Sequence, residues 1–477
     1  MEIKTSGPKT KTSKTKIRNP NAIMNEGPTI VGMMSAIIER GGSIDSAVRD
    51  VAKNGPKRSA SLFRSIAVRA DTRQIPDISH GLSEMLTSLP AEATAYRRSV
   101  HMVMVAAASP DQSERKRMLS DASDISLTGL KEIGENYSTS LNVPCMMIFG
   151  LGIMVPMVLM SILPMLSLGG VFGNSSSSIG PIVLVTVVVI PAIIMSLIFS
   201  VKEKNPFMRP VSNMDPKYIL PALSAAPAAL AVFVLTNDLQ MSLMIAAVVS
   251  GIAMLAYVFP YVRSESVREK QEMLLQDAVF ELGNRLIAGE NFETAIVKAV
   301  GMRAECSAIA ESISREMAVC RGDACAAIKA SVGKVSVRIS DVFCDVYRCS
   351  LKDVRDAGRL AVSIGRQIQD QDTVRKGIKN KLKSMTDMMT GTAAVFAPLV
   401  LGMSVTMLEP VSRVMEGADL GGTSQILSVY LIELCILIAV LTSFLNGKTD
   451  IMYMTYRMGI ILPVSMAVFT MCSAIGL

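Results

Sequence analysis

The chain has 477 residues, of which 50% are hydrophobic and 19% are charged, and its formal net charge is +7. A mean hydropathy of +0.40, with 34 Met and no Trp, favours an integral membrane protein with adaptable helix packing. Only two His are present, which argues against most acid–base catalysis.

The chain starts with a basic, polar segment and continues into a longer segment with a helical pattern. In residues 1–20, Lys and Arg alternate with Thr, Ser, Gly and Pro, so this tail is predicted to be disordered and to carry no signal peptide. A role of the tail in binding anionic lipid headgroups is the alternative. In residues 21–140, apolar positions recur at helical spacing between Gly and Pro breaks, which predicts a helical domain.

Residues 136–201 contain no Asp, Glu, Lys or Arg. Two apolar runs, Leu141–Leu166 and Pro181–Val201, are joined by a Gly/Ser-rich connector. A hydrocarbon core needs roughly 20 helical residues, and both runs reach that length. We therefore predict a transmembrane hairpin here.

Five further apolar runs reach or approach the length of a membrane span. They are Ile219–Leu235, Leu239–Val262, Met388–Leu408, Ile426–Leu445 and Met458–Leu477. The first of these is the shortest and is rich in Ala, and only the fourth contains a charged residue, Glu433. The sequence thus predicts about seven transmembrane helices.

The distribution of basic residues predicts the orientation of these helices. With the N-terminus in the cytoplasm, the cytoplasmic segments receive 47 of the 48 Lys and Arg, and only Arg413 falls outside. The opposite orientation would violate the positive-inside rule. We therefore expect a multi-pass protein of the cell membrane, with the N-terminus and both soluble segments on the cytoplasmic side.

Residues 263–387 form the second soluble segment, and their pattern predicts about six helices. The last predicted helix, 352–386, ends in a basic cluster that we interpret as a partner-contact surface, with anchoring of the helix at the lipid surface as the alternative: Arg375, Lys376, Lys379, Lys381 and Lys383. Five of the eight cysteines lie in this segment. Their spacing differs from the C-x2-C pattern of metal sites, so we expect reduced core residues and no metal.

The two soluble segments resemble each other. GGSIDSAVRDVA (41–52) aligns without gaps on GENFETAIVKAV (289–300), at an offset of 248 residues. Three pairs of matched positions are an N-cap, an acid in the first helical turn and a small residue: Ser43 with Asn291, Asp45 with Glu293, and Ala47 with Ala295. Each segment then leads into a span with a Pro at its outer end, Pro164 or Pro410. Similarity kept over this distance indicates a duplication.

These features predict an all-α polytopic membrane protein with two repeated cytoplasmic helical-bundle domains. The predicted organisation is a tail (1–20), helical domain 1 (21–140), four transmembrane helices (141–262), helical domain 2 (263–387) and three transmembrane helices (388–477).

Motifs of common catalytic sites are missing from the sequence. GxxxxGK[ST], HExxH and GxSxG do not occur, so we predict that the chain is not an enzyme and binds no cofactor. One ionisable residue, Glu433, lies inside a predicted span. Such a residue must face protein or be protonated, so we interpret it as a polar latch between helices; a protonated Glu bonded to a neighbouring Ser or Thr is the alternative.

The duplicated unit, the G-x-[SNF]-[DE]-x-A helix start and the Pro-ended spans resemble the type II secretion system F family. Two copies and about seven spans are similar to its archaeal branch, which includes the archaellum and Tad-type pilus platforms. LIELCILIAVLTSFLNG (431–447) is similar to a late span of that branch. The resemblance covers roughly residues 25–477.

The resemblance implies a membrane platform protein of a type IV pilus-like machine. It implies a hexameric secretion ATPase and pilin-like subunits as partners, with the basic cluster, Asp45 and Glu293 as candidate contacts, and it is compatible with a homodimer. A repeat-built transporter or permease is the competing class, although its polar midplane site would need more than Glu433. A membrane-tethered nucleic-acid binder ranks last, because no base-stacking motif is present.

Overall fold

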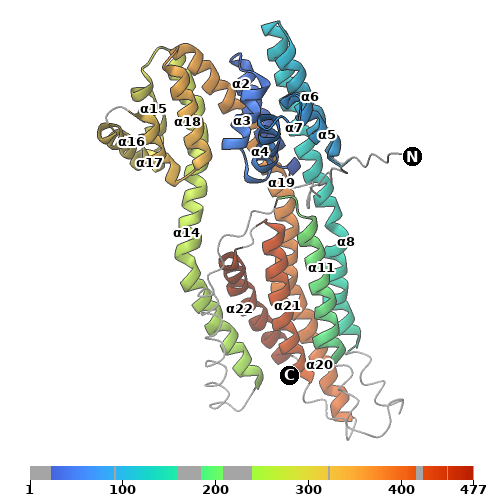
Figure 1. The fold of residues 1–477 in the computed structure, drawn as a ribbon. Helices are drawn as coiled ribbons and strands as arrows, with labels where there is room; N and C mark the ends of the chain where they lie inside the picture. Colours follow the sequence, from blue (N-terminus) through green and yellow to red (C-terminus); the bar gives the residue numbers. More distant parts are fainter. Residues whose placement is uncertain are drawn as a thin grey trace, which may run out of the picture. The chain divides into compact units, whose positions relative to one another are not determined.

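The structure is a computed structural model that describes residues 23–90, 93–159, 184–207, 239–320, 323–414, 423–447 and 450–475 (Figure 1). Every regular element in these ranges is a helix, as predicted. The contacts divide the chain into two units, residues 1–129 and 130–477.

Unit 1 is a bundle of short helices followed by the start of a long one. Its elements are α2 (Gly27–Glu39), α3 (Ile44–Asn54), α4 (Lys57–Asp71), α5 (Ile78–Ser88), α6 (Thr94–Ala108) and the first part of α7 (Gln112–Ser140). The bundle is held by apolar side chains with almost no exposure: Ile30, Val48, Val51, Phe63, Leu82 and Val100. It buries a core of its own without lipid.

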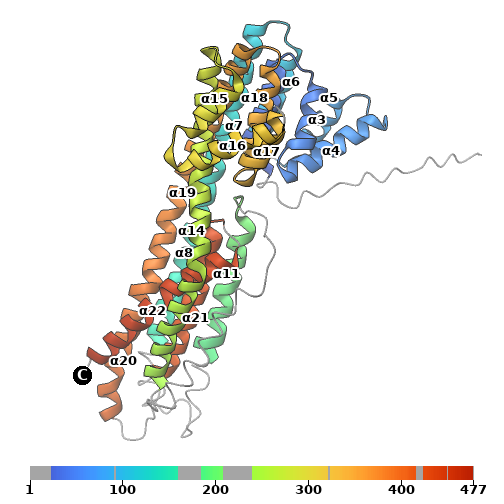
Figure 2. The same cartoon turned by 90° about the vertical axis from the view of Figure 1, so that its left-hand side faces the viewer.

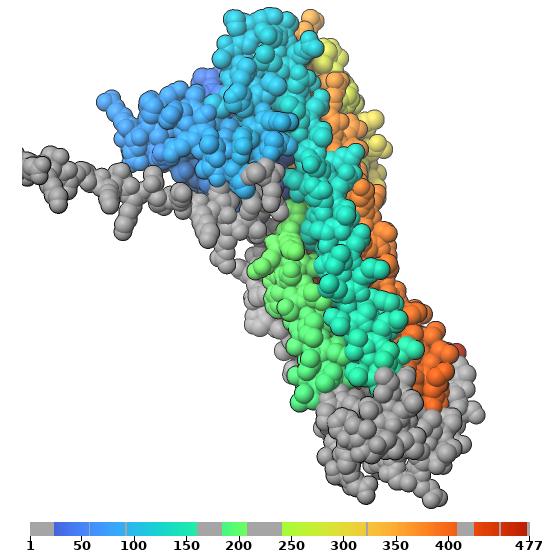
Figure 3. Space-filling view, turned by 90° about the vertical axis from the view of Figure 1, so that its right-hand side faces the viewer, coloured from blue at the N-terminus to red at the C-terminus, as the bar shows by residue number. Residues whose placement is uncertain are grey.

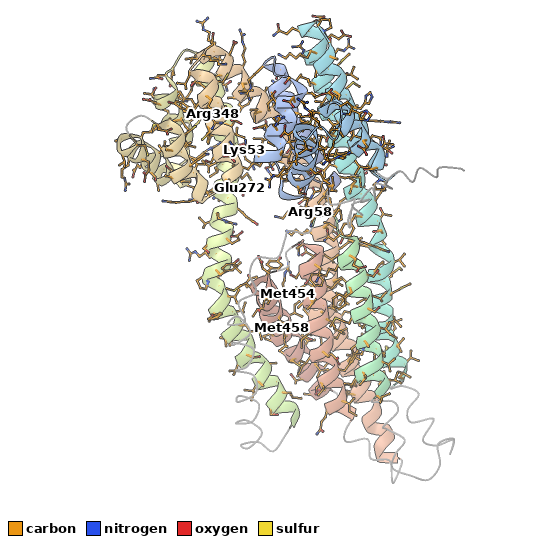
Figure 4. The ribbon with its side chains drawn as sticks, viewed as in Figure 1. Lys53, Arg58, Glu272, Arg348, Met454 and Met458 are labelled. Atoms are coloured by element: carbon orange, nitrogen blue, oxygen red, sulfur yellow. The ribbon has the colours of Figure 1, made fainter. Side chains whose placement is uncertain are left out.

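Unit 2 contains a second helical bundle. Its short helices are α15 (Phe292–Gly301), α16 (Ser307–Val319), α17 (Ala324–Ser331) and α18 (Val337–Ser350). They pack on the C-terminal part of α14 (Leu239–Ile287) and the N-terminal part of α19 (Val354–Gly391), around Leu282, Ile296, Ile313, Ile328 and Phe343. Ser336, just before α18, donates a 3.0 Å hydrogen bond to Glu272 of α14, which Figure 4 labels.

The rest of unit 2 is an apolar bundle. Its elements are α8 (Asn142–Phe149), the π-helical turns η2 (Gly150–Met154), η3 (Val185–Val189) and η7 (Thr392–Phe396), and the helices α11 (Ile190–Lys204), α20 (Ala397–Val414), α21 (Thr423–Leu445) and α22 (Ile451–Ile475). The N-terminal half of α14 completes it and packs on α22. Figure 3 shows α8 and α11 side by side on one face, and Met454 and Met458 of α22 (Figure 4) pack partly buried against the core.

Six helices of the described residues are long and apolar enough to cross a membrane: Gln112–Leu159, Val185–Lys204, Met241–Ile287, Val354–Met407, Ser424–Leu445 and Ile451–Ala474. Each contains or overlaps one of the predicted spans. The seventh predicted span, Ile219–Leu235, lies outside the described residues, as do the N-terminal tail and Pro164.

Three of these helices run without a break from an apolar to a charged segment, and α14 and α19 do so side by side (Figure 2). The predicted boundaries after residues 140, 262 and 387 therefore fall at or within continuous helices. In lipid the backbone must satisfy its hydrogen bonds internally, so a helix is not easily interrupted at the membrane surface. Even Pro260 stands inside α14 without ending it.

Candidate functional site

The helix α21 is the most enclosed of the six apolar helices. Of its most apolar stretch 67% is buried, compared with 33% to 39% in the other five. Leu427, Leu431, Leu434 and Leu441 have at most 1% of their surface exposed. The other apolar helices are therefore arranged around α21, and any movement of α21 must be transmitted through its contacts.

One of these contacts is a hydrogen bond between a side chain and a widened helical turn. The hydroxyl group of Tyr430, which is fully buried, donates a 2.5 Å bond to the carbonyl oxygen of Gly152. Gly152 lies in η2, where the backbone bonds skip one residue further than in an α-helix. A Cβ atom at Gly152 would lie 3.0 Å from Leu434 and 3.4 Å from Ile194, so the glycine permits the close approach.

A second side chain of α21 approaches a second π-helical turn. The thiol of Cys435, five residues after Tyr430, lies 4.0 Å from the carbonyl oxygen of Ala393 in η7. A thiol is a weak donor, so this contact contributes less than the phenol contact. The two contacts nevertheless connect α21 to the π-helical turns of two different long helices.

These two long helices are built alike along the sequence. Gly150, the first residue of η2, lies 39 residues after Asp111, and Thr392, the first residue of η7, lies 39 residues after Asp353. Each aspartate caps the start of its helix. Asp111 accepts a 3.0 Å bond from the N–H of Ser113, and Asp353 a 2.7 Å bond from the N–H of Arg355.

The capping bonds favour the charged form of both aspartates. Hydrogen bonds from the Ser113 side chain and backbone lower the pKa of Asp111. Backbone hydrogen bonds from Asp356 and Arg355 lower the pKa of Asp353. The same cap, the same helix length and the same widened turn thus occur twice, at an offset of 242 residues.

A second pair of matched sites lies at the start of α3 and of α15. Gly41 and Gly289, each following the end of a helix, have φ values of +80° and +92°, where a side chain would be strained. The N–H of Gly41 bonds to Ile38 and that of Gly289 to Leu286, both at 3.0 Å. The N–H of the next residue, Gly42 or Glu290, donates to the carbonyl oxygen five residues earlier, which completes a Schellman motif in both.

The N-caps that follow are similar but not identical. Ser43 and Asn291 both have extended backbone angles, and their carbonyl oxygens accept bonds from the hydroxyl groups of Ser46 and Thr294. Only Ser43 also caps with its side chain, which accepts a 3.2 Å bond from the N–H of Ser46. The predicted alignment of these two sites therefore extends to the backbone.

The long helices α7 and α19 cross closely at a glycine. A Cβ atom at Gly134 would collide with the side chain of Ile378. Beside this crossing, Lys381 forms a 2.8 Å ion pair with Glu135 and lowers the pKa of that carboxyl group. Both groups are about half exposed, so the pair contributes little to stability.

This ion pair separates Lys381 from the rest of the predicted basic cluster. Arg375, Lys376, Lys379 and Lys383 are all exposed. Positions 376, 379 and 383 follow the i, i+3, i+7 spacing of one helix face, which we call the lysine ridge. Lys381 lies on a different face and is occupied by α7.

The predicted acidic contacts differ from each other in their surroundings. Asp45 forms a 3.1 Å ion pair with Arg49, which also holds Asp71 at 2.6 Å. Glu293 is exposed in the first turn of α15. Asp45 is thus part of an ion-pair network on its own bundle, whereas Glu293 is accessible.

Comparison of the chain with protein-family models, with curated proteins and with solved structures finds no match.

Two residues that connect α21 to a π-helical turn, Tyr430 and Gly152, were not predicted as site residues from the sequence. Glu433 was singled out as the polar latch because it is the only ionisable residue in a predicted span. It is partly exposed, and no hydrogen bond to it is formed within the described ranges, so its role as a latch stays a prediction. A buried polar bond between α21 and the turn η2 is formed by Tyr430 and Gly152. A Tyr in the middle of an apolar run was the available signal, since a buried phenol requires a partner.

Metal binding receives no support from the described part of the chain. No group of three or more His, Cys, Asp or Glu side chains there is arranged to hold a metal ion.

Proposed function

We propose that the chain is the integral membrane platform of a type IV pilus-like or type II secretion-like machine. In this role it couples a hexameric cytoplasmic secretion ATPase to the extraction of pilin-like subunits from the membrane and to their polymerisation. The two helical bundles receive the motion of the ATPase, and the apolar bundle passes it on to the subunits.

One observation carries this proposal. Two continuous helices, Gln112–Leu159 and Val354–Met407, each join a charged segment to an apolar one and contain a π-helical turn at the same distance from an Asp cap. A continuous helix moves as a rigid element, so a displacement at its charged end reaches the membrane. A machine that acts through two equivalent lever arms requires such a pair.

The π-helical turns give these lever arms a place where the motion is transferred. Such turns widen the helix locally and often occur at functional sites. Here their carbonyl groups contact Tyr430 and Cys435 of α21. A rotation or shift of either arm would therefore act on the central helix through a specific contact rather than through general packing.

The lysine ridge is the surface that we assign to the ATPase. Its three lysines are exposed, and they lie on a different face of α19 from Lys381, which is paired with Glu135. An exposed ridge of one charge sign attracts an acidic partner and accelerates its association. Lys381, on another face of the same arm, contacts Glu135 of α7 and is therefore not assigned to the ATPase surface.

Copurification tests the proposal. The full chain, tagged at its C-terminus, would be isolated from native membranes after mild cross-linking, and ATP hydrolysis and the identity of bound proteins would be measured. We expect a hexameric ATPase with no membrane span of its own. If no ATPase is recovered and the purified chain instead accelerates solute flux in liposomes, the transporter alternative replaces the proposal.

A further inference from the structure

One narrow strip of α21 is covered less than the opposite face of this helix. It consists of four residues at i, i+4, i+7 and i+11, which share one helix face: Val429, Glu433, Ile436 and Val440. Val429 is 43% exposed, and the other three are partly exposed. The opposite face of α21 carries the fully buried leucines described above. We call these four residues the α21 strip.

The strip carries a carboxyl group at the middle of the membrane helix. Glu433 is the eleventh residue of the 23-residue helix α21. No hydrogen bond to it is formed within the described part of the chain. Lipid tails offer no donor, so a carboxyl group at this depth requires a partner from protein.

The remainder of the strip has the properties of a surface for another helix. Val429, Ile436 and Val440 are β-branched and lose little side-chain freedom when a helix packs on them. In a membrane, helices associate by close packing together with hydrogen bonds from polar side chains. An apolar strip with one acceptor at its centre provides both.

We propose that the α21 strip is the docking face for the apolar helix of a separate, single-span subunit. That helix carries a hydrogen-bond donor (an amine, amide or hydroxyl group) at the depth of Glu433. In the function proposed above this subunit is the pilin-like one, so the inference rests on that proposal. It adds the helix face that receives the subunit and the chemistry that selects it.

Another segment of this chain fits the strip less well. The predicted span 219–235 has one side-chain donor, Ser224, which lies in its first third, and Pro at its central position 227, which has no N–H group. The sequence of its central part therefore offers no side-chain donor. A helix of a separate subunit can also leave the strip again, as the proposed function requires of a subunit that is extracted from the membrane.

Site-specific photo-cross-linking in native membranes tests the inference. A benzoylphenylalanine would replace Val429 in the full chain, and, as a control, Ile252, which is 61% exposed on α14 outside the strip. We expect the probe at 429, but not that at 252, to cross-link to an apolar segment of one other protein. Peptide sequencing should show a donor side chain or free amine in that segment.

Two variants in the background of the 429 probe determine whether Glu433 selects the partner. The variant Glu433→Gln keeps the acceptor and should retain the cross-link. The variant Glu433→Leu should lower its yield about tenfold, the size expected for one hydrogen bond between membrane helices. An unchanged yield in Glu433→Leu, or adducts only with lipid or with residues 208–238 of the same chain, overturns the inference.

ATPase copurification from the same membranes separates this inference from the proposed function. If the ATPase is recovered with all variants but the cross-link fails as described, the docking face is wrong and the platform function stands. If the ATPase is missing from the wild type, the platform function itself fails.

Discussion

The hydroxyl group of Tyr430 donates a hydrogen bond to the carbonyl oxygen of Gly152, across 278 residues of sequence and between two membrane helices. The bond joins the central helix to the π-helical turn of one long arm. The residue four positions after Gly152 is Pro156, which has no N–H group to donate to this carbonyl oxygen in an α-helical ladder, so the carbonyl is available to the phenol. This contact is therefore the most specific link between arm and centre in the apolar bundle.

We predict that Tyr430→Phe weakens this link without altering the packing. The loss of one buried hydrogen bond should lower the stability of the purified protein by about 1 kcal/mol, because the Gly152 carbonyl is left without its donor. Thermal unfolding in detergent measures the change. Tyr456→Phe on α22 is the control, since within the described ranges no hydrogen bond is recorded for that hydroxyl group. Equal effects of both substitutions would argue against a specific link.

A second prediction concerns the crossing of α7 and α19. Gly134→Ala should destabilise the protein by about 1–3 kcal/mol, because the new methyl group overlaps Ile378 and forces the arms apart. Gly377→Ala, on α19 beside the same crossing, meets no atom within 4 Å and should stabilise it by about 0.5–1 kcal/mol through helix propensity.

The collision itself is tested by a second-site change. Ile378→Ala removes the atoms that the new methyl group would meet, so the double variant should lose less stability than the two single losses combined. Thermal unfolding of the four proteins gives this coupling. Purely additive effects would mean that Gly134 and Ile378 do not determine the approach of the two helices.

A third prediction separates the lysine ridge from the ion pair. Replacing Lys376, Lys379 and Lys383 by Glu should reduce ATPase copurification at least about tenfold, because the electrostatic attraction is reversed. Lys381→Glu changes the same charge on the same helix but faces Glu135, so it should spare the ATPase. If the triple variant binds the ATPase normally and only its affinity for anionic lipid falls, the ridge is a lipid anchor.

Local sequence signals located the helices of the second bundle well, and their physical basis is clear. About six helices were predicted in residues 263–387, and the short ones, such as Phe292–Gly301 and Ala324–Ser331, occur there because caps such as Asp323 and breaks such as Gly289 act within a few residues. The continuity of α14 and α19 through the predicted boundaries was missed. Charge and hydropathy change there, but no residue stops the helix.

The candidate site was less predictable, because its key contacts join residues far apart in the chain. The π-helical turn Gly150–Met154 has a local signal that the prediction did not use, because it ends two residues before Pro156, which cannot donate the α-helical bond. The side chain of α21 that binds its carbonyl group has no such signal in the sequence. Glu433 was predicted as a site residue because an ionisable residue in a span is costly. Tyr430 is neutral, and its presence in an apolar run carries no comparable cost. Only the three-dimensional arrangement identifies which polar group has a partner.

A fourth prediction tests the orientation of the chain in the membrane. A reporter that is active only in the cytoplasm should be active when fused after Lys204 or Lys383, and inactive after Asn174 or Gly421. We expect this because 47 of the 48 Lys and Arg lie in the segments predicted to be cytoplasmic, and only one lies outside them. The activity of the reporter is measured in whole cells for all four fusions, and the protein level of each fusion is the control. The reverse pattern at two of these four sites would overturn the model of seven spans with a cytoplasmic N-terminus.

The last prediction uses the cap of α19. Hydrogen bonds from the N–H groups of Asp356 and Arg355 lower the pKa of Asp353 in the folded protein. The stabilisation by the charged Asp353 cap is therefore complete above the pKa of the unfolded state, about 4. It is lost as the pH falls through the lower pKa of the folded state. Asp353→Asn accepts the same bonds without titrating, so its unfolding temperature should fall less steeply than that of the wild type below about pH 4.

Two further variants make this measurement specific. Asp353→Ala lacks the cap and should be less stable than the wild type at neutral pH, where the cap is fully charged. Glu311→Gln, at an exposed position of α16, removes one carboxyl group without touching a cap and is the matched control. If the unfolding temperatures of Asp353→Asn and of the wild type fall equally at acid pH, the charge of Asp353 at the start of α19 does not stabilise the protein.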